Sequence, residues 1–167
     1  LIAAGLTGFA TKSIDVALPA GSRGYALPGV RLRRRRVVGP VIEAGIRRVR
    51  PEAAVIRAAQ WAVSDRQAAL LLCLAVQQRL VHAPRLVSAL GLITRAASRP
   101  LITGLVADLC DGAHSLGELD FARLCRNRGI PEPSRQVVRR LPVGRIYLDV
   151  AWDDLGLVVE IDGSHHG

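Results

Sequence analysis

The stretch that most constrains the fold is residues 145–163, which has the pattern of two β-strands joined by a tight turn. Apolar and polar residues alternate with a period of two on both sides of the Asp/Gly-rich residues 153–156, as expected for a β-hairpin. Whether the loop has two residues or four, Asp149 falls directly opposite Glu160. The hairpin therefore places two carboxylates side by side on one face of a sheet.

This pairing needs an explanation, because like charges that oppose each other across two strands destabilise a sheet. Asp162 adds a third carboxylate to the same face. One explanation is a bound divalent cation, since Mg²⁺ takes one or two carboxylates together with phosphate oxygens of a substrate. The other is that this face is open to water, where acidic side chains cost little. The first explanation predicts a metal site, and the second predicts only a solvated surface.

The net charge of +9 favours a polyanionic partner, nucleic acid above all. Of the 23 basic residues only Lys12 is not arginine, and the guanidinium fork matches the geometry of phosphate. A GC-rich genome would also enrich arginine, so composition alone does not decide between these origins. Half of the 167 residues are apolar, which is ample for a buried core in one domain or two small ones.

Three cysteines without a CxxC spacing predict reduced thiols in a cytoplasmic protein rather than a disulfide framework or a zinc site. The longest strongly apolar run, residues 68–76, is too short to cross a bilayer, and no signal peptide is visible, so we expect no membrane partner. The chain begins without methionine and stops directly after a predicted strand, and we expect it to be a fragment cut at both ends.

Residues 1–50 are predicted to be rich in short strands. Residues 13–19 alternate as one strand, and residues 30–38 form a second in which arginines are interleaved with valines and leucine. Arginine on both faces is typical of an edge strand with at least one solvated face. The alternative is that this run, through Arg33 and Arg35, contacts nucleic-acid phosphates.

From residue 51 the apolar period changes to that of helices, so residues 51–112 are predicted to form a helical block. Ser64 has the position of a helix cap, and proline in a first turn is compatible with a helix start. We find no catalytic constellation in this block. Its expected helices begin at Pro51 and Asp65 and cover residues 84–90 and 100–110.

Residues 113–167 are predicted to form a third unit, in the order helix, strand, strand, strand. The helix begins at Ser115 with the S-x-x-E pattern of a capping box, in which Glu118 returns a hydrogen bond to the first amide. Glu118 also lies on the inward stripe, at i, i+3 and i+7 with Phe121 and Cys125, where its carboxylate could join those of the hairpin. The two roles are compatible. The strands are expected at residues 135–141, 145–152 and 157–162.

These blocks together resemble the PD-(D/E)XK restriction-endonuclease-like superfamily, in which a helix carries Glu, one strand carries Asp and the next carries Glu. Within it, the last third of the chain is similar to an uncharacterised domain family related to very-short-patch-repair endonucleases. Three motifs in this order are moderately specific for the family, whereas the E-x-D motif alone would be weak evidence for it. The motifs are Ser115-Leu116-Gly117-Glu118, Asp149-Val150-Ala151-Trp152 and Glu160-Ile161-Asp162-Gly163-Ser164-His165-His166.

The resemblance implies an α+β protein: short strands and a helical block, then a restriction-endonuclease-like α/β unit that is incomplete at its C-terminal end. It implies metal-dependent hydrolysis of DNA phosphodiester bonds, with Mg²⁺ or Mn²⁺ held by Asp149 and Glu160 and with Glu118 as an outer ligand. Asp162 or His166 would serve as general base. The arginines expected to hold the nucleic-acid backbone are Arg33, Arg35, Arg139, Arg140 and Arg145.

The catalytic lysine of the superfamily is replaced here by Asp162, so its role would pass to His166 or Arg145. That departure leaves a second hypothesis, a non-catalytic nucleic-acid-binding protein of antitoxin type on a nuclease scaffold. The upstream region resembles the middle of longer proteins from high-GC bacteria in which a winged helix of the AbiEi antitoxin type precedes the nuclease-like domain. This looser resemblance implies a toxin or another protein as partner.

Overall fold

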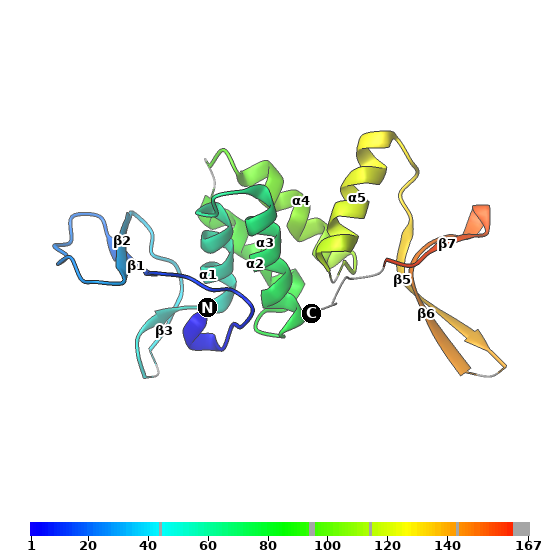
Figure 1. The fold of residues 1–167 in the computed structure, drawn as a ribbon. Coiled ribbons are helices and arrows are strands. Elements are labelled where there is room, and N and C mark those ends of the chain that lie inside the picture. Colours follow the sequence, from blue (N-terminus) through cyan, green and yellow to red (C-terminus); the bar gives the residue numbers. More distant parts are fainter. Residues whose placement is uncertain (44, 94–95, 114, 143, 162–167) are drawn as a thin grey trace.

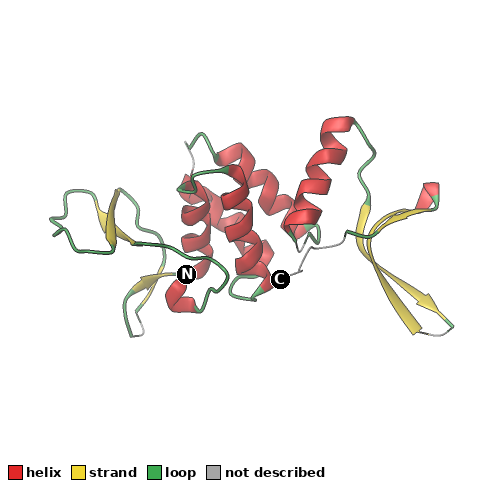
Figure 2. Ribbon diagram, viewed as in Figure 1, coloured by secondary structure: helices red, strands yellow, loops and turns green. Residues whose placement is uncertain are grey.

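A computed structural model describes residues 1–43, 45–93, 96–113, 115–142 and 144–161. The protein is of the α+β class, as expected, with helices in the middle of the molecule (Figure 2). Figure 1 shows the N-terminal strands and the C-terminal strands on opposite sides of these helices. In the described part of the chain, no helix is both long and apolar enough to span a bilayer.

The N-terminal part forms two small sheets after a short 3₁₀ turn, η1 (Ile2–Ala4). The first sheet is a parallel pair, so the arginine-rich strand keeps one unpaired edge, as its alternating charges predict. This strand ends at residue 35, three residues earlier than expected. The elements are the parallel pair β1 (Ile14–Pro19) and β2 (Val30–Arg35) and the antiparallel pair β3 (Val41–Ile42) and β4 (Arg48–Val49).

The predicted helices of the middle block are confirmed, with starts that agree to within a residue. Ser64 caps the second helix, because its Oγ accepts a hydrogen bond from the amide of Gln67 at 3.2 Å. Ile56, Leu72 and Leu86 are fully buried, so the apolar stripes of the helices meet in one core. The elements are α1 (Pro51–Gln60), α2 (Asp65–Gln77), α3 (Ala83–Ala89), the 3₁₀ turn η2 (Leu90–Ile93) and α4 (Arg99–Cys110).

The C-terminal unit has the predicted order of one helix and three strands. Its sheet is antiparallel, in the order β5-β6-β7. The helix begins after Ser115, whose Oγ accepts from the amide of Glu118 at 3.1 Å, and it ends at Gly129, which adopts the left-handed conformation with φ 64°. The elements are α5 (Leu116–Arg128), β5 (Ser134–Leu141), β6 (Gly144–Trp152), the 3₁₀ turn η3 (Asp153–Leu155) and β7 (Leu157–Val159).

Helix α5 joins the helical block to the sheet, because it contributes to two separate apolar clusters. Leu119 belongs to the core of the block, whereas Cys125 packs with Val150 and Trp152 of β6. The ring of Phe121 meets that of Trp152 edge-on at 6.2 Å. The expected domain boundary near residue 113 falls between α4 and α5. Helix α5 nevertheless packs both on the helical block before this boundary and on the sheet after it.

An ion-pair network, in which the side chains of Asp108 and Arg135 are buried and those of Arg126 and Glu132 are exposed, also crosses this junction. Both carboxylate oxygens of Asp108, on α4, accept hydrogen bonds at 2.8 Å from Arg126 of α5, and these bonds raise the pKa of Arg126. Arg135 of β5 lies 3.4 Å from Asp108 and 3.4 Å from Glu132, with its side chain only 4% exposed. Two acids thus balance two arginines where α4, α5 and β5 meet.

Candidate active site

The hairpin register is the one that the sequence predicts. Strands β6 and β7 pair Val150 with Val159. Extended by one residue, this register places Glu160 directly opposite Asp149, so the two side chains leave the same face of the hairpin. The turn is the four-residue alternative, in which η3 is followed by Gly156 with φ 61°.

Strand β7 is shorter than expected, because it ends at Val159 rather than at residue 162. The amide of Ile161 donates a hydrogen bond to Oδ2 of Asp149 at 3.0 Å. This side chain satisfies a backbone donor that a longer strand would pair with backbone. Asp149 is half-buried and Glu160 is exposed, so one carboxylate is held in place while the other is free to turn toward a ligand.

Ile161 also connects the hairpin to the first turn of α5. A Cβ atom on Gly117 would lie 2.9 Å from Cγ2 of Ile161, so only glycine allows this close approach. The next residue is Glu118, which is 7% exposed. Burial, and then the negative charges of Glu118 and Asp120, raise the pKa of the Cys73 thiol on α2 to about 12. Glu118 therefore lies between the hairpin and the helical block.

The predicted carboxylates do not converge as three ligands of one ion. Among the described residues, no three acidic, histidine or cysteine side chains are grouped in a way that could hold a metal. Asp149 is engaged by the backbone amide of Ile161, and Glu118 is buried on α5. The opposed pair Asp149 and Glu160 is the donor set that remains. Asp162 and His166 lie outside the described residues.

The predicted arginines of β2 lie beside an aromatic ring. The guanidinium carbons of Arg33 and Arg35 are 4.9 and 5.1 Å from the ring centroid of Trp61, within the range of a cation–π contact. Arg33 is also paired with Asp15, with Nε 2.9 Å from Oδ1. Arg33 is thus partly neutralised, whereas Arg35 lines a pocket between β2 and α1.

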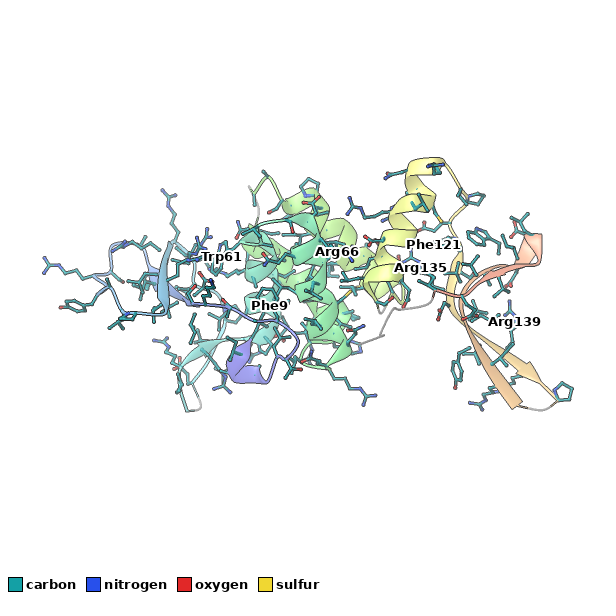
Figure 3. All side chains as sticks on the ribbon, viewed as in Figure 1. Phe9, Trp61, Arg66, Phe121, Arg135 and Arg139 are labelled. Atoms are coloured by element: carbon teal, nitrogen blue, oxygen red, sulfur yellow. The ribbon has the colours of Figure 1, made fainter. Side chains whose placement is uncertain are left out.

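The predicted arginines of the C-terminal sheet differ in their surroundings. Arg139, labelled on the sheet in Figure 3, is paired with the carboxylate of Asp153. Arg140 lies directly opposite Arg145 across β5 and β6, and both are exposed. Like charges opposed across strands destabilise a sheet unless an anion lies between them. This pair is therefore the sheet's best candidate for a phosphate contact.

Two buried charged residues that belong to polar clusters were not among those predicted from the sequence. Arg57 is 4% exposed on α1, and Asp108 is 3% exposed on α4. The signal was present, because each interrupts an otherwise apolar helical stripe and a buried charge needs a partner. Arg36 and Gln60, which line a pocket with Arg57, carry no signal of their own in the sequence.

Comparison with known proteins returns no match, whether to a family model, to a curated protein or to a solved structure. The resemblance to the restriction-endonuclease-like superfamily therefore depends on the three sequence motifs.

Proposed function

We propose that the chain is a metal-dependent endonuclease that hydrolyses DNA phosphodiester bonds. The observation that supports this function best is the opposed carboxylate pair Asp149 and Glu160, located by the β6–β7 register. Ile161 holds this end of the hairpin against the first turn of α5, next to Glu118. The superfamily resemblance, in which a helix carries Glu and two strands carry Asp and Glu, is the sequence argument for the same function.

The donor chemistry of the pair fits Mg²⁺ or Mn²⁺. Carboxylates on neighbouring strands have Cβ atoms about 5 Å apart, and Mg²⁺ is usually held by one or two carboxylates plus substrate phosphate oxygens. Asp149 and Glu160 would hold the ion, and Glu118 would act from outside this pair. A bound ion polarises the phosphate and lowers the pKa of a water.

The remaining residues of the proposed site bind the substrate and handle the proton. Arg140 and Arg145, opposed at the end of the sheet, would hold the DNA backbone without reading its sequence. Asp162 or His166 would accept the proton of the attacking water. We place this activity in a bacterial cytoplasm, and a toxin or another protein partner remains a prediction.

The test is cleavage of supercoiled plasmid by the full chain with Mg²⁺ or Mn²⁺. We expect nicked and then linear DNA, and we expect Asp149→Asn and Glu160→Gln each to reduce cleavage to the level seen in EDTA. Asp154→Asn is the matched control, since Asp154 is an exposed acid in the turn of the same hairpin. Cleavage by the wild type that is no greater than that of the double variant would rule the activity out.

A second candidate is a non-catalytic nucleic-acid-binding protein of antitoxin type. The replacement of the superfamily lysine by Asp162 favours it, as does the absence of a three-ligand metal group among the described side chains. Salt-sensitive DNA binding that persists in EDTA and survives Asp149→Asn, without any cleavage, would support this candidate over the endonuclease.

A further inference from the structure

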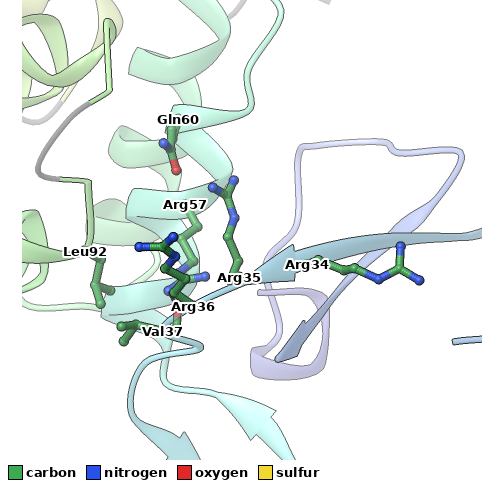
Figure 4. Close-up of a pocket in the computed structure, with 7 residues that line it drawn as sticks. All are labelled: Arg34, Arg35, Arg36, Val37, Arg57, Gln60 and Leu92. Carbon is green, nitrogen blue, oxygen red and sulfur yellow. Dashed lines mark hydrogen bonds between the residues drawn. The ribbon is translucent and has the colours of Figure 1, made fainter. Parts of the chain in front are cut away.

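A pocket of about 390 Å³ lies between the end of β2 and helix α1 (Figure 4). This volume is within the range of small-molecule sites, about 300–1,000 Å³. Its polar lining consists of four arginines and one glutamine, and none of the described residues that line it is acidic. Figure 4 shows three of the arginines gathered beside α1 and Arg34 pointing away from them. The gathered side chains are Arg35, Arg36 and Arg57.

Arg57 is the unusual member of this cluster. It is 4% exposed, and its Nη2 donates to the carbonyl of Val37. Its Nε and Nη1 are buried and have no hydrogen-bond partner among the described residues. Leaving donors of a charged group unsatisfied in a buried position costs more than leaving neutral ones unsatisfied. The Nε and Nη1 atoms of Arg57 can therefore donate hydrogen bonds to a ligand.

The surroundings of Arg57 add positive charge. Burial, and then the charge of Arg35, lower the pKa of Arg57. Arg36, which lines the same pocket, is exposed and able to move. Buried charges in proteins are ordinarily paired, and none of the described residues that line the pocket is acidic, so a bound anion would supply the counter-charge that this cluster lacks.

We propose that this pocket binds a phosphate group, with the free Nε and Nη1 donors of Arg57 forming the floor and Arg35, Arg36 and Gln60 closing around the anion. Arginine recognises phosphate through paired N–H donors, and several guanidinium groups suit a multiply charged, tetrahedral anion. This site lies at the opposite end of the molecule from the β5–β6–β7 sheet (Figure 1), so it does not depend on the proposed hydrolysis.

The test measures binding of inorganic phosphate to the full chain by calorimetry and by the midpoint of thermal unfolding, at constant ionic strength in a phosphate-free buffer. Binding to the native state raises that midpoint by mass action. We expect Arg36→Gln to weaken phosphate binding by about tenfold to a hundredfold, the usual effect of losing hydrogen bonds to a charged group. We expect Arg57→Met to abolish the response.

Arg31→Gln is the matched control, since Arg31 is an exposed arginine of the same strand that does not line the pocket. It should keep the wild-type affinity. Because Arg36 is exposed, Arg36→Gln keeps the proposal testable even where Arg57→Met does not fold. Equal phosphate affinities for the wild type, Arg31→Gln and Arg36→Gln would overturn the proposal, as would a wild type that does not respond to phosphate.

The same variants identify where the phosphate comes from. If it belongs to a nucleic-acid backbone, inorganic phosphate will displace a labelled DNA duplex, and Arg36→Gln will weaken DNA binding more than Arg31→Gln does. If it belongs to a small phosphorylated compound, phosphate will bind without displacing the duplex. Both results support the pocket. Asp149→Asn should leave phosphate affinity unchanged, which separates this site from failure of the proposed endonuclease.

Discussion

Two buried arginines of this protein show opposite solutions to the same physical problem. Arg135 has a side chain that is 4% exposed and is surrounded by Asp108 and Glu132. Arg57 is 4% exposed as a whole residue, yet its neighbours are the Val37 carbonyl, which accepts from its Nη2, and another arginine, Arg35. The first arrangement is complete within the chain and joins three elements. The second is incomplete, which is the pattern expected where a ligand supplies the missing charge.

The C-terminal sheet carries two further places where like charges lie opposite each other, one acidic and one basic. Glu160, one residue beyond the end of β7, comes opposite Asp149 of β6 when the register is extended, while Arg140 and Arg145 pair directly across β5 and β6. Each pairing is unfavourable for the sheet alone and favourable once a ligand of the opposite charge binds. Balanced charges thus hold the fold, whereas opposed like charges mark where we propose that ligands bind.

The largest expected effect is on the balanced network. Asp108→Ala should lower the free energy of unfolding by about 3–5 kcal/mol, because it removes the central acid and leaves Arg135 buried beside the exposed Glu132 alone. Chemical denaturation measures this change. Asp111→Ala, an exposed acid at the end of the same helix, should change stability by less than about 0.5 kcal/mol. A similar small loss for Asp108→Ala would contradict the structural role of the network.

A second effect concerns the stability of the protein in alkali. The native Cys73 thiol keeps its proton up to a pKa of about 12, whereas in the unfolded chain it titrates near the ordinary value of 9.0. Between these values the native state binds more protons, so the free energy of unfolding should fall as pH rises from about 9 to about 12.

Glu118→Gln isolates the contribution of one acid to this shift. Removing the negative charge of Glu118 should lower the pKa of Cys73, since that charge is one of the causes that raise it. The titration of the thiol, followed by NMR of its Cβ, measures the change. An unchanged pKa would show that the charge of Glu118 does not act on Cys73.

The cap of α5 should have a moderate effect. Ser115→Ala removes the acceptor for the amide of Glu118 and should cost about 1 kcal/mol of stability, the usual value for a lost helix cap. Thermal or chemical unfolding measures it. Ser115→Asp, which can still cap the helix, should restore most of the loss, and failure of this rescue would show that Ser115 acts in another way.

The smallest effect concerns the opposed arginines. Arg140→Glu converts a like-charge pair with Arg145 into an ion pair, so it should raise stability by about 0.2–1 kcal/mol while it weakens DNA binding. Arg128→Glu, at the exposed end of α5, is a control for net charge. Equal losses of DNA affinity in the two variants would contradict a specific contact between Arg140 and the DNA backbone.

Local patterns were enough to predict most of the elements, although not the short strands β3 and β4. The period of two fixed the β6–β7 register, and the Ser64 and Ser115 caps located two helix starts, because these signals act within a few residues. What could not be predicted depends on contacts between distant segments. The Asp108 network joins residues from three elements, and the pocket at Arg57 forms where β2 meets α1.

Dependence on contacts between distant segments also explains why only part of the candidate site could be predicted. Strands β6 and β7 pair in the predicted register, which sets Glu160 opposite Asp149 when it is extended by one residue beyond β7. Glu118 was predicted to complete a three-ligand group, but the position of α5 is set by its packing on α2, α4 and β6, which the helical period alone does not contain. The side chain of Glu118 is buried, as expected, and its negative charge contributes to the raised pKa of Cys73.

The most direct test of the claim that opposed like charges mark a ligand site is anomalous diffraction from crystals of the full chain soaked in Mn²⁺. The account predicts a manganese peak in contact with both Asp149 and Glu160, and no such peak in crystals of Asp149→Asn. An ordered hairpin with both carboxylates in place and no manganese beside them would contradict it.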